Sequence, residues 1–164
     1  MDKLEYIPGD LVMTNGIPIG TKKGIVYQVT ESNPDKYRPV EDGNSFTELK
    51  GSVTFSNIKG KTVDDECFLF GDCGAWVKDI VPIPLTPEIL EKNGWKRTQI
   101  FIDDDGLEFH TYIDDERCLD LQYYPQYKKF AAFICKQEVL SDIEYVHQLQ
   151  HLLFGLGLNH EMEV

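Results

Sequence analysis

The stretch from Ser141 to Gly157 constrains the fold most, because its apolar residues recur with the period of an α-helix. Ser141 and Glu144 have the S-x-x-E spacing of a capping box, and Gly157 supplies a left-handed stop. We therefore expect one long amphipathic helix, followed by a short final strand over residues 158–164. Eight side chains form its apolar arc: Ile143, Tyr145, Val146, Leu149, Leu152, Leu153, Phe154 and Leu156. Burying a large apolar side chain contributes about 1.5–3 kcal/mol, so this arc is expected to supply most of the core around it.

The N-terminal half is rich in short β-type runs. Between residues 6 and 80, β-branched and aromatic residues such as those of GIVYQV (24–29) alternate with turn signals. Pro8-Gly9-Asp10 and Asn15-Gly16 are two of these turns, and Asn33-Pro34-Asp35 has the composition of a loop. Many short strands at this spacing favour a small barrel. The PGDLV opening followed by GIVYQV is similar to an SH3-like barrel.

A proline-rich junction separates the two halves. Residues 81–85, VPIPL, are held extended by their prolines. Thr86 then caps a short helix with Pro87 at its first position, and Asn93-Gly94 ends it. The sequence therefore predicts a β-rich, barrel-like domain over residues 1–81 and an α+β domain over residues 82–164.

The C-terminal half contains four strand patterns before the long helix. They cover residues 100–102, 107–113, 118–124 and 130–135, with the acidic turn Asp103–Asp105 and Gly106 after the first. An antiparallel meander with the long helix across one face is the economical arrangement. The fold class of the whole chain is therefore predicted to be α+β.

Charge excludes several classes of partner. The formal net charge is −12, which argues against direct nucleic-acid binding and against docking on anionic membranes. No basic-then-apolar leader and no apolar run of membrane-spanning length occur, so we expect a soluble, cytoplasmic protein. The four cysteines, Cys67, Cys73, Cys118 and Cys135, are then expected to be reduced, three of them buried inside strands.

Two segments carry a resemblance to known sequences. PIPLTPEIL (82–90) and YVHQLQH (145–151), together with the NGW after the first, resemble a group of small proteins described only as hypothetical. These proteins occur in gut anaerobic bacteria and in the phages and mobile elements that they carry. The resemblance covers residues 81–164 and implies a mobile-element setting and a shared fold. It assigns no activity, so it transfers no catalytic residues.

His147 and His151 are the only histidines with ligand-like spacing. Two imidazoles four apart on a helix can share a metal ion. Gln148 stands where a zinc protease would carry its glutamate base, which excludes that class. The helical wheel puts both histidines at the polar edge of the arc, and no third ligand is identifiable. Solvated histidines are therefore the favoured interpretation, and no cofactor or metal is expected.

Two further features are candidate protein-binding groups. Tyr123, Tyr124 and Tyr127 surround a predicted loop, where exposed tyrosines favour protein contacts. The alternative is a turn whose rings fold back over the helix. Gln150 falls inside the apolar arc, where a buried amide must find a partner: it either hydrogen-bonds the sheet or marks a contact surface left partly open.

No catalytic motif occurs, so a non-enzymatic protein-binding accessory factor of a phage or mobile element is the preferred hypothesis. The first alternative is an acidic nucleic-acid mimic that inhibits a host or defence protein. The carboxylate triplets Asp64–Glu66, Asp103–Asp105 and Asp114–Glu116 have the composition of turns, and the sequence leaves open whether they share one face. The second is a metal-binding protein or hydrolase that uses His147 and His151. The sequence leaves the oligomeric state open.

Overall fold

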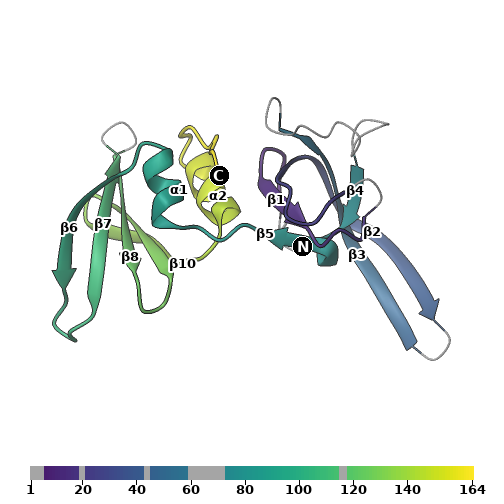
Figure 1. Cartoon of the computed structure of the whole chain (residues 1–164), viewed down its shortest axis with the longest axis horizontal. Helices are drawn as coiled ribbons and strands as arrows, with labels where there is room; N and C mark the ends of the chain where they lie inside the picture. Colours follow the sequence, from purple (N-terminus) through teal and green to yellow (C-terminus); the bar gives the residue numbers. More distant parts are fainter. Residues whose placement is uncertain (1–5, 19–20, 43–44, 59–72, 115–117) are drawn as a thin grey trace. The chain divides into compact units, whose positions relative to one another are not determined.

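The computed structural model describes residues 6–18, 21–42, 45–58, 73–114 and 118–164 (Figure 1). The chain divides into two compact units, Met1–Ile83 and Pro84–Val164. The described residues form two antiparallel five-stranded sheets, one in each unit, and two α-helices, both in the second unit. The fold is therefore mostly β, with its α-helical part in the C-terminal unit. Neither helix is long and apolar enough to cross a membrane.

The sheet of the N-terminal unit has the strand order β4-β3-β2-β1-β5. Its strands are β1 (Leu11–Thr14), β2 (Tyr27–Asp42), β3 (Ser45–Asn57), β4 (Cys73–Trp76) and β5 (Ile80–Pro82), with the 3₁₀ turn η2 (Val77–Asp79) before β5. The predicted loop at Asn33-Pro34-Asp35 lies inside β2, where the pairing with β3 shifts register between Asn33 and Tyr37. A bulge of this kind accommodates a proline that cannot donate a ladder hydrogen bond.

The core of this unit lies against one face of that sheet. Tyr27 and Phe55 pack with their ring centroids 5.1 Å apart. The predicted turn at Pro8-Gly9-Asp10 is confirmed: Gly9 has a φ of 100°, and the buried Asp10 carboxylate accepts from the Ile7 N–H at 2.9 Å. Among the described residues no pairing joins β4 to β5, so the sheet is open and closure into a barrel is not shown. The buried cluster comprises Tyr6, Val12, Tyr27, Val29, Val53, Phe55, Ala75 and Ile80.

The sheet of the C-terminal unit is a meander with the strand order β10-β9-β8-β7-β6. Its strands are β6 (Lys96–Ile102), β7 (Glu108–Asp114), β8 (Leu119–Tyr124), β9 (Lys129–Ile134) and β10 (Gln137–Ile143). The antiparallel meander is confirmed, but the sequence prediction lacked β10. This strand follows β9 through a two-residue turn, Cys135-Lys136, in which both residues have positive φ.

The short helix α1 (Pro87–Lys92) forms as predicted. The Thr86 hydroxyl accepts from the Ile89 N–H at 3.4 Å, and Pro87 occupies the first turn. Gly94 follows the helix with a φ of 92°, a conformation that glycine adopts without steric cost.

The helix α2 (Val146–Gly155) is shorter than predicted and begins later. Ser141 lies in β10, so the predicted capping box at Ser141 and Glu144 is wrong. Gln148 instead reaches back to the start of the helix, where its Oε1 accepts from the N–H groups of the two preceding residues, Glu144 at 2.7 Å and Tyr145 at 3.0 Å. The C-terminal stop at Gly157 is confirmed, with a φ of 69° and a Leu158 N–H that donates to the Leu153 carbonyl at 2.9 Å.

The buried side of α2 is narrower than the predicted arc. Val146, Leu149 and Leu153 are fully buried, whereas Phe154 is 58% exposed and Leu156 is also exposed. Figure 1 shows α1 and α2 on the same side of the C-terminal sheet. We call the side of the sheet that these helices cover the core face, and the opposite side the outer face.

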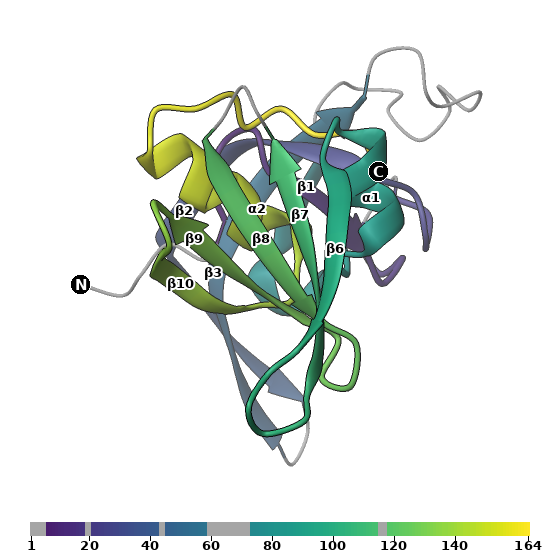
Figure 2. The same ribbon diagram turned by 90° about the vertical axis from the view of Figure 1, so that its left-hand side faces the viewer.

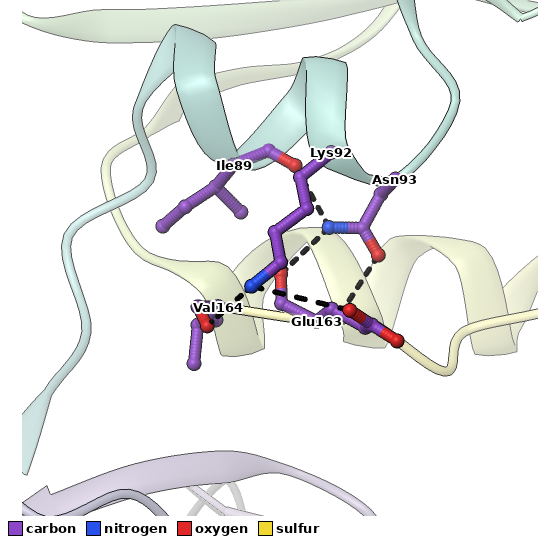
Figure 3. A network of polar contacts seen from close by, with 5 residues as sticks. All are labelled: Ile89, Lys92, Asn93, Glu163 and Val164. Carbon is purple, nitrogen blue, oxygen red and sulfur yellow. Dashed lines mark hydrogen bonds and ion pairs between the residues drawn. The ribbon is translucent and has the colours of Figure 1, made fainter.

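The segment after α2 is not a strand, so the predicted final strand is wrong. Its main chain is held by α1 instead (Figure 3). The Asn93 amide nitrogen donates to the carbonyls of Ile89 and Glu163, both at 2.7 Å, and its oxygen accepts from the Glu163 N–H at 2.8 Å. Lys92 Nζ donates to the main-chain oxygen of Val164 at 2.9 Å. One side-chain amide therefore supplies the pairing that a neighbouring strand would give.

Candidate functional site

Three aromatic rings form a row across the outer face of the C-terminal sheet. Phe101 in β6 and Phe109 in β7 are direct cross-strand partners, and their rings stack at 5.3 Å between centroids. The ring of Tyr124 in β8 lies 5.7 Å from Phe109. We call Phe101, Phe109 and Tyr124 the aromatic ladder. Figure 2 shows the strands that carry it in front of both helices, so neither α1 nor α2 covers it.

The pleat of the sheet explains why the ladder points away from the core. Tyr112 stands three residues after Phe109, so the two side chains point to opposite faces of the sheet. Tyr112 pairs with Leu121, which pairs with Ala132, and all three are fully buried on the core face. The same alternation that fills the core therefore brings the ladder rings to the outer face.

A cavity of about 350 Å³ adjoins the ladder at Tyr124. Its shape depends on a bulge in β10: the pairing with β9 steps from Leu140 to Ile143, and Asp142 has a φ of 57°. Lys129 ties the bulge to the sheet, because its Nζ lies 3.0 Å from carboxylate oxygens of both Asp142 and Glu144. The cavity is lined by Leu107, Tyr124, Tyr127, Lys129, Phe130, Ala131, Glu138, Ser141 and Asp142.

The electrostatics of the cavity keep its tyrosine neutral and its lysine charged. Burial raises the pKa of the Tyr124 phenol, and Glu138 and Asp103 raise it further. The hydrogen bond from Lys129 to Asp142, followed by that to Glu144, raises the pKa of this half-buried lysine. The Tyr124 hydroxyl donates to Gln122 Oε1 at 3.0 Å. At neutral pH the cavity therefore combines aromatic walls with fixed charges at its rim.

The structure separates the three tyrosines of the predicted loop. Tyr124 and Tyr127 both line the cavity, and Tyr127 is exposed. Tyr123 points to the other face, where its ring packs at 4.6 Å against Phe130 and at 6.0 Å against His110. Only two of the three therefore share a surface with the ladder.

Gln150 lies inside the C-terminal unit. Its side chain is buried, and its Nε2 donates to the His160 carbonyl at 3.2 Å. This amide therefore reaches the segment after α2. A buried position keeps Gln150 away from any partner that approaches the surface.

His147 and His151 are neighbours, with ring centroids 5.6 Å apart and nearly perpendicular planes. His147 is buried and stacks on Tyr145, so its predicted place at the polar edge is wrong. The described residues contain no group of three or more His, Cys, Asp or Glu side chains that could hold a metal ion. His110 is engaged elsewhere, 2.7 Å from Glu108 Oε1.

The cysteines do not match the expectation of burial where they can be described. Cys118 and Cys135 are exposed and form no disulfide, and each has a positive φ in a turn. Cys67 lies outside the described residues, as do the acidic triplet Asp64–Glu66 and residues 115–116 of Asp114–Glu116. The third triplet, Asp103–Asp105, forms the turn between β6 and β7, where Asp103 Oδ1 accepts from the N–H groups of Asp105 and Leu107.

A second cavity, of about 430 Å³, lies in the N-terminal unit beside Lys36, Arg38 and Trp76. Lys36 Nζ is 5.8 Å from the centroid of the Trp76 ring, a cation–π contact worth about 0.5–1 kcal/mol at an exposed site. The cavity joins two cationic side chains to an aromatic ring. It therefore has a different chemical character from the ladder.

Sequence reasoning found Tyr124 and Tyr127 but missed Phe101, Phe109 and Leu107. The alternation over residues 107–113 was visible, but the structure turns its more apolar face, that of Leu107 and Phe109, outward and buries Tyr112 on the other face. Only the packing of Tyr112 in the core decides which face turns outward. No family model, no curated protein and no solved structure matches the chain.

Proposed function

We propose that this protein is a non-enzymatic, protein-binding accessory factor of a phage or mobile element, and that it holds its partner on the aromatic ladder and the adjoining cavity. The observation that carries the proposal is the row of three rings on a sheet face that neither helix covers. The mobile-element setting is supported by the resemblance of PIPLTPEIL and YVHQLQH to small proteins of gut bacteria and their phages.

The ladder suits a contact surface on physical grounds. Aromatic side chains bury large apolar areas and lose little conformational entropy, so they dominate the centre of many interfaces. These rings are fixed by strands rather than by a loop, which reduces the entropy lost on binding. Tyr127 and Leu107 extend the apolar surface from the ladder into the cavity.

The partner is expected to present a basic segment. The C-terminal unit contains 15 Asp and Glu residues against 7 Lys and Arg residues, which gives it −8 of the net charge of −12. Glu138 and Asp142 line the cavity, and the Asp103–Asp105 turn follows the strand that carries Phe101. Lysine or arginine side chains can pair with these carboxylates and lie over the rings. Such binding weakens as salt concentration rises.

Selection of random short peptides on the immobilised protein tests this function. The enriched peptides are expected to be basic and extended, and to lose binding to a Tyr124→Ser, Tyr127→Ser double variant. Phe154→Ser is the control, because Phe154 is an aromatic residue on α2 that is as exposed as Tyr127 and is not part of the ladder. Enrichment of acidic peptides, or equal loss of binding with Phe154→Ser, contradicts the proposal.

A second candidate is the acidic mimic of nucleic acid, favoured by the concentration of negative charge in the C-terminal unit. It predicts competition between the protein and a nucleic acid for one basic site on the partner.

For the N-terminal unit we also propose an SH3-like barrel, supported by the pairing of β5 with β1. Backbone hydrogen bonds between β4 and β5 would establish it.

A further inference from the structure

The cavity of the N-terminal unit is built on the side of the sheet opposite the core. Ala75 pairs with Val53, and both are buried in the core of this unit. Because side chains alternate along a strand, the neighbours of these two residues point to the other side of the sheet. These neighbours all line the cavity: Ser52, Thr54, Gly74 and Trp76.

A bulge in β2 forms the rim of the cavity. Between Asn33 and Tyr37 the strand gains residues relative to β3, and the pairing shifts register. Lys36 lies in this bulge, and its Nζ is 5.8 Å from the centroid of the half-buried Trp76 ring. Arg38 stands two residues further along the strand and also lines the cavity. One wall is therefore aromatic, and the rim beside it is cationic.

The charge of this cavity is opposite to that of the chain. The sequence contains 28 Asp and Glu residues against 16 Lys and Arg residues. Among the described residues no Asp or Glu lines the cavity, whereas Lys36 and Arg38 do. Glu31 lies on the same side of the sheet, opposite Thr54, but outside the lining. The cavity therefore favours an anion, although the net charge of the chain repels one.

The size of the cavity and the open floor at Gly74 fit a small molecule. A volume of about 430 Å³ lies within the range of small-molecule sites, roughly 300–1,000 Å³. A β-carbon at Gly74 would lie 3.9 Å from the Val53 carbonyl oxygen, an ordinary van der Waals contact, so the floor has room for a larger residue. An anion held by Lys36 lies beside the Trp76 ring, on which a planar group can stack.

We propose that this cavity binds a small molecule that joins a phosphate group to a planar ring, of which a nucleoside monophosphate is the simplest case. Lys36 and Arg38 hold the phosphate, because two cations balance its two negative charges. Trp76 stacks on the ring, and the hydroxyl groups of Ser52 and Thr54 offer it hydrogen bonds. A nucleic-acid polymer is disfavoured, because a net charge of −12 repels every further phosphate. The inference goes beyond the proposed function, because this cavity and the aromatic ladder lie in different units.

Isothermal titration calorimetry of the whole chain measures this binding. The probes are the ribonucleoside monophosphates, their nucleosides and inorganic phosphate. At least one monophosphate is expected to bind about tenfold or more tightly than its nucleoside or inorganic phosphate, because only it engages both the ring and the cations. Lys36→Gln and Arg38→Gln should each weaken this binding on the order of tenfold.

Gly74→Val closes the site without changing its cations. The valine side chain occupies the floor and suits a β-strand, so binding should be lost while circular dichroism stays that of the folded chain. Lys23→Gln is the matched control, because Lys23 is an exposed lysine of the same unit that does not line the cavity. This variant should bind as the wild type does.

Five results would overturn the proposal. The first three are no binding of any monophosphate at millimolar concentration, unchanged binding by Gly74→Val, and a loss with Lys23→Gln equal to that with Arg38→Gln. The fourth is inorganic phosphate that binds as tightly as the monophosphates, because the ring then contributes nothing. The fifth is a single-stranded oligonucleotide that binds more tightly per nucleotide than the monophosphates, which would assign the cavity to a polymer.

Discussion

The turn between β9 and β10 gives the most discriminating prediction about stability. Cys135 and Lys136 have φ angles of 50° and 67°, and they connect Ile134 to its direct partner Gln137. Two residues with positive φ in a two-residue hairpin define a type I′ turn, for which Asn-Gly is the preferred sequence. Both side chains are exposed, so replacing them changes mainly the backbone energy.

The expected gain follows from two opposing effects. The left-handed backbone conformation costs a residue with a β-carbon roughly 1–2 kcal/mol of conformational energy, and glycine avoids this cost. Glycine also increases the conformational entropy of the unfolded chain, which lowers the free energy of unfolding by roughly 0.5–1 kcal/mol. Lys136→Gly should therefore raise the free energy of unfolding by about 0.5–1 kcal/mol, and adding Cys135→Asn should bring the total to about 1–1.5 kcal/mol.

Urea titration followed by tryptophan fluorescence measures this gain. Trp95 is buried in the C-terminal unit, and Trp76 is in the N-terminal unit, so a Trp76→Phe background makes the signal specific to the C-terminal unit. Lys136→Ala is the control, because alanine removes the lysine side chain but keeps the β-carbon. Equal stabilisation by alanine and glycine would refute the argument from backbone strain.

Four further changes probe the C-terminal unit by the same titration. Leu153→Asp buries a charge in the core and should unfold the unit, so a folded variant would show that α2 is misplaced. Leu149→Ala should cost about 2–5 kcal/mol by leaving a cavity. Thr86→Ala should cost about 1 kcal/mol through the lost helix cap. It should also raise the pKa of Glu88, which the Thr86 hydroxyl lowers, and an NMR titration of Glu88 without that rise would contradict the contact. Asn93→Asp keeps an oxygen that can accept from the Glu163 N–H, but it replaces the amide donor to the Ile89 and Glu163 carbonyls by a second carboxylate oxygen. The free energy of unfolding should fall by about 1–3 kcal/mol, and an unchanged stability would contradict the role of this amide.

The features that local sequence signals could predict are those with local causes. Thr86 with Pro87, Gly157 and the turn at Gly9 each act through a cap or a backbone conformation that a few residues determine. The strands β7 to β9 were recognisable because their side chains alternate. Strand β10 was missed because Cys135-Lys136 carries none of the glycine or asparagine that usually marks a type I′ turn.

The start of α2 shows how a local signal can lose to tertiary pairing. Ser141 and Glu144 match a capping box, but residues 137–143 form cross-strand hydrogen bonds with β9 instead. The helix then begins at Val146, and its buried face turns so that it includes His147. The apolar arc was predicted too wide at the end of the helix, where Phe154 and Leu156 are exposed, whereas Ile143 is buried as part of β10.

The candidate site was only partly accessible to sequence reasoning. The tyrosine loop was visible, but the ladder requires Phe101, Phe109 and Tyr124 to come from three strands in a defined register. A shift of one residue would turn each ring to the core face. Register depends on the packing of Tyr112 and Leu121, which a single sequence does not encode in any local motif.

The central claim is that the outer face of the C-terminal sheet binds a basic protein segment. Two-dimensional NMR of the isotope-labelled protein, titrated with a peptide from the selection, tests it most directly. The account predicts that the amide signals of Phe101, Phe109, Tyr124 and Tyr127 shift together and that these shifts diminish at high salt. Shifts confined to α2, or to the strands beside Trp76, would contradict it.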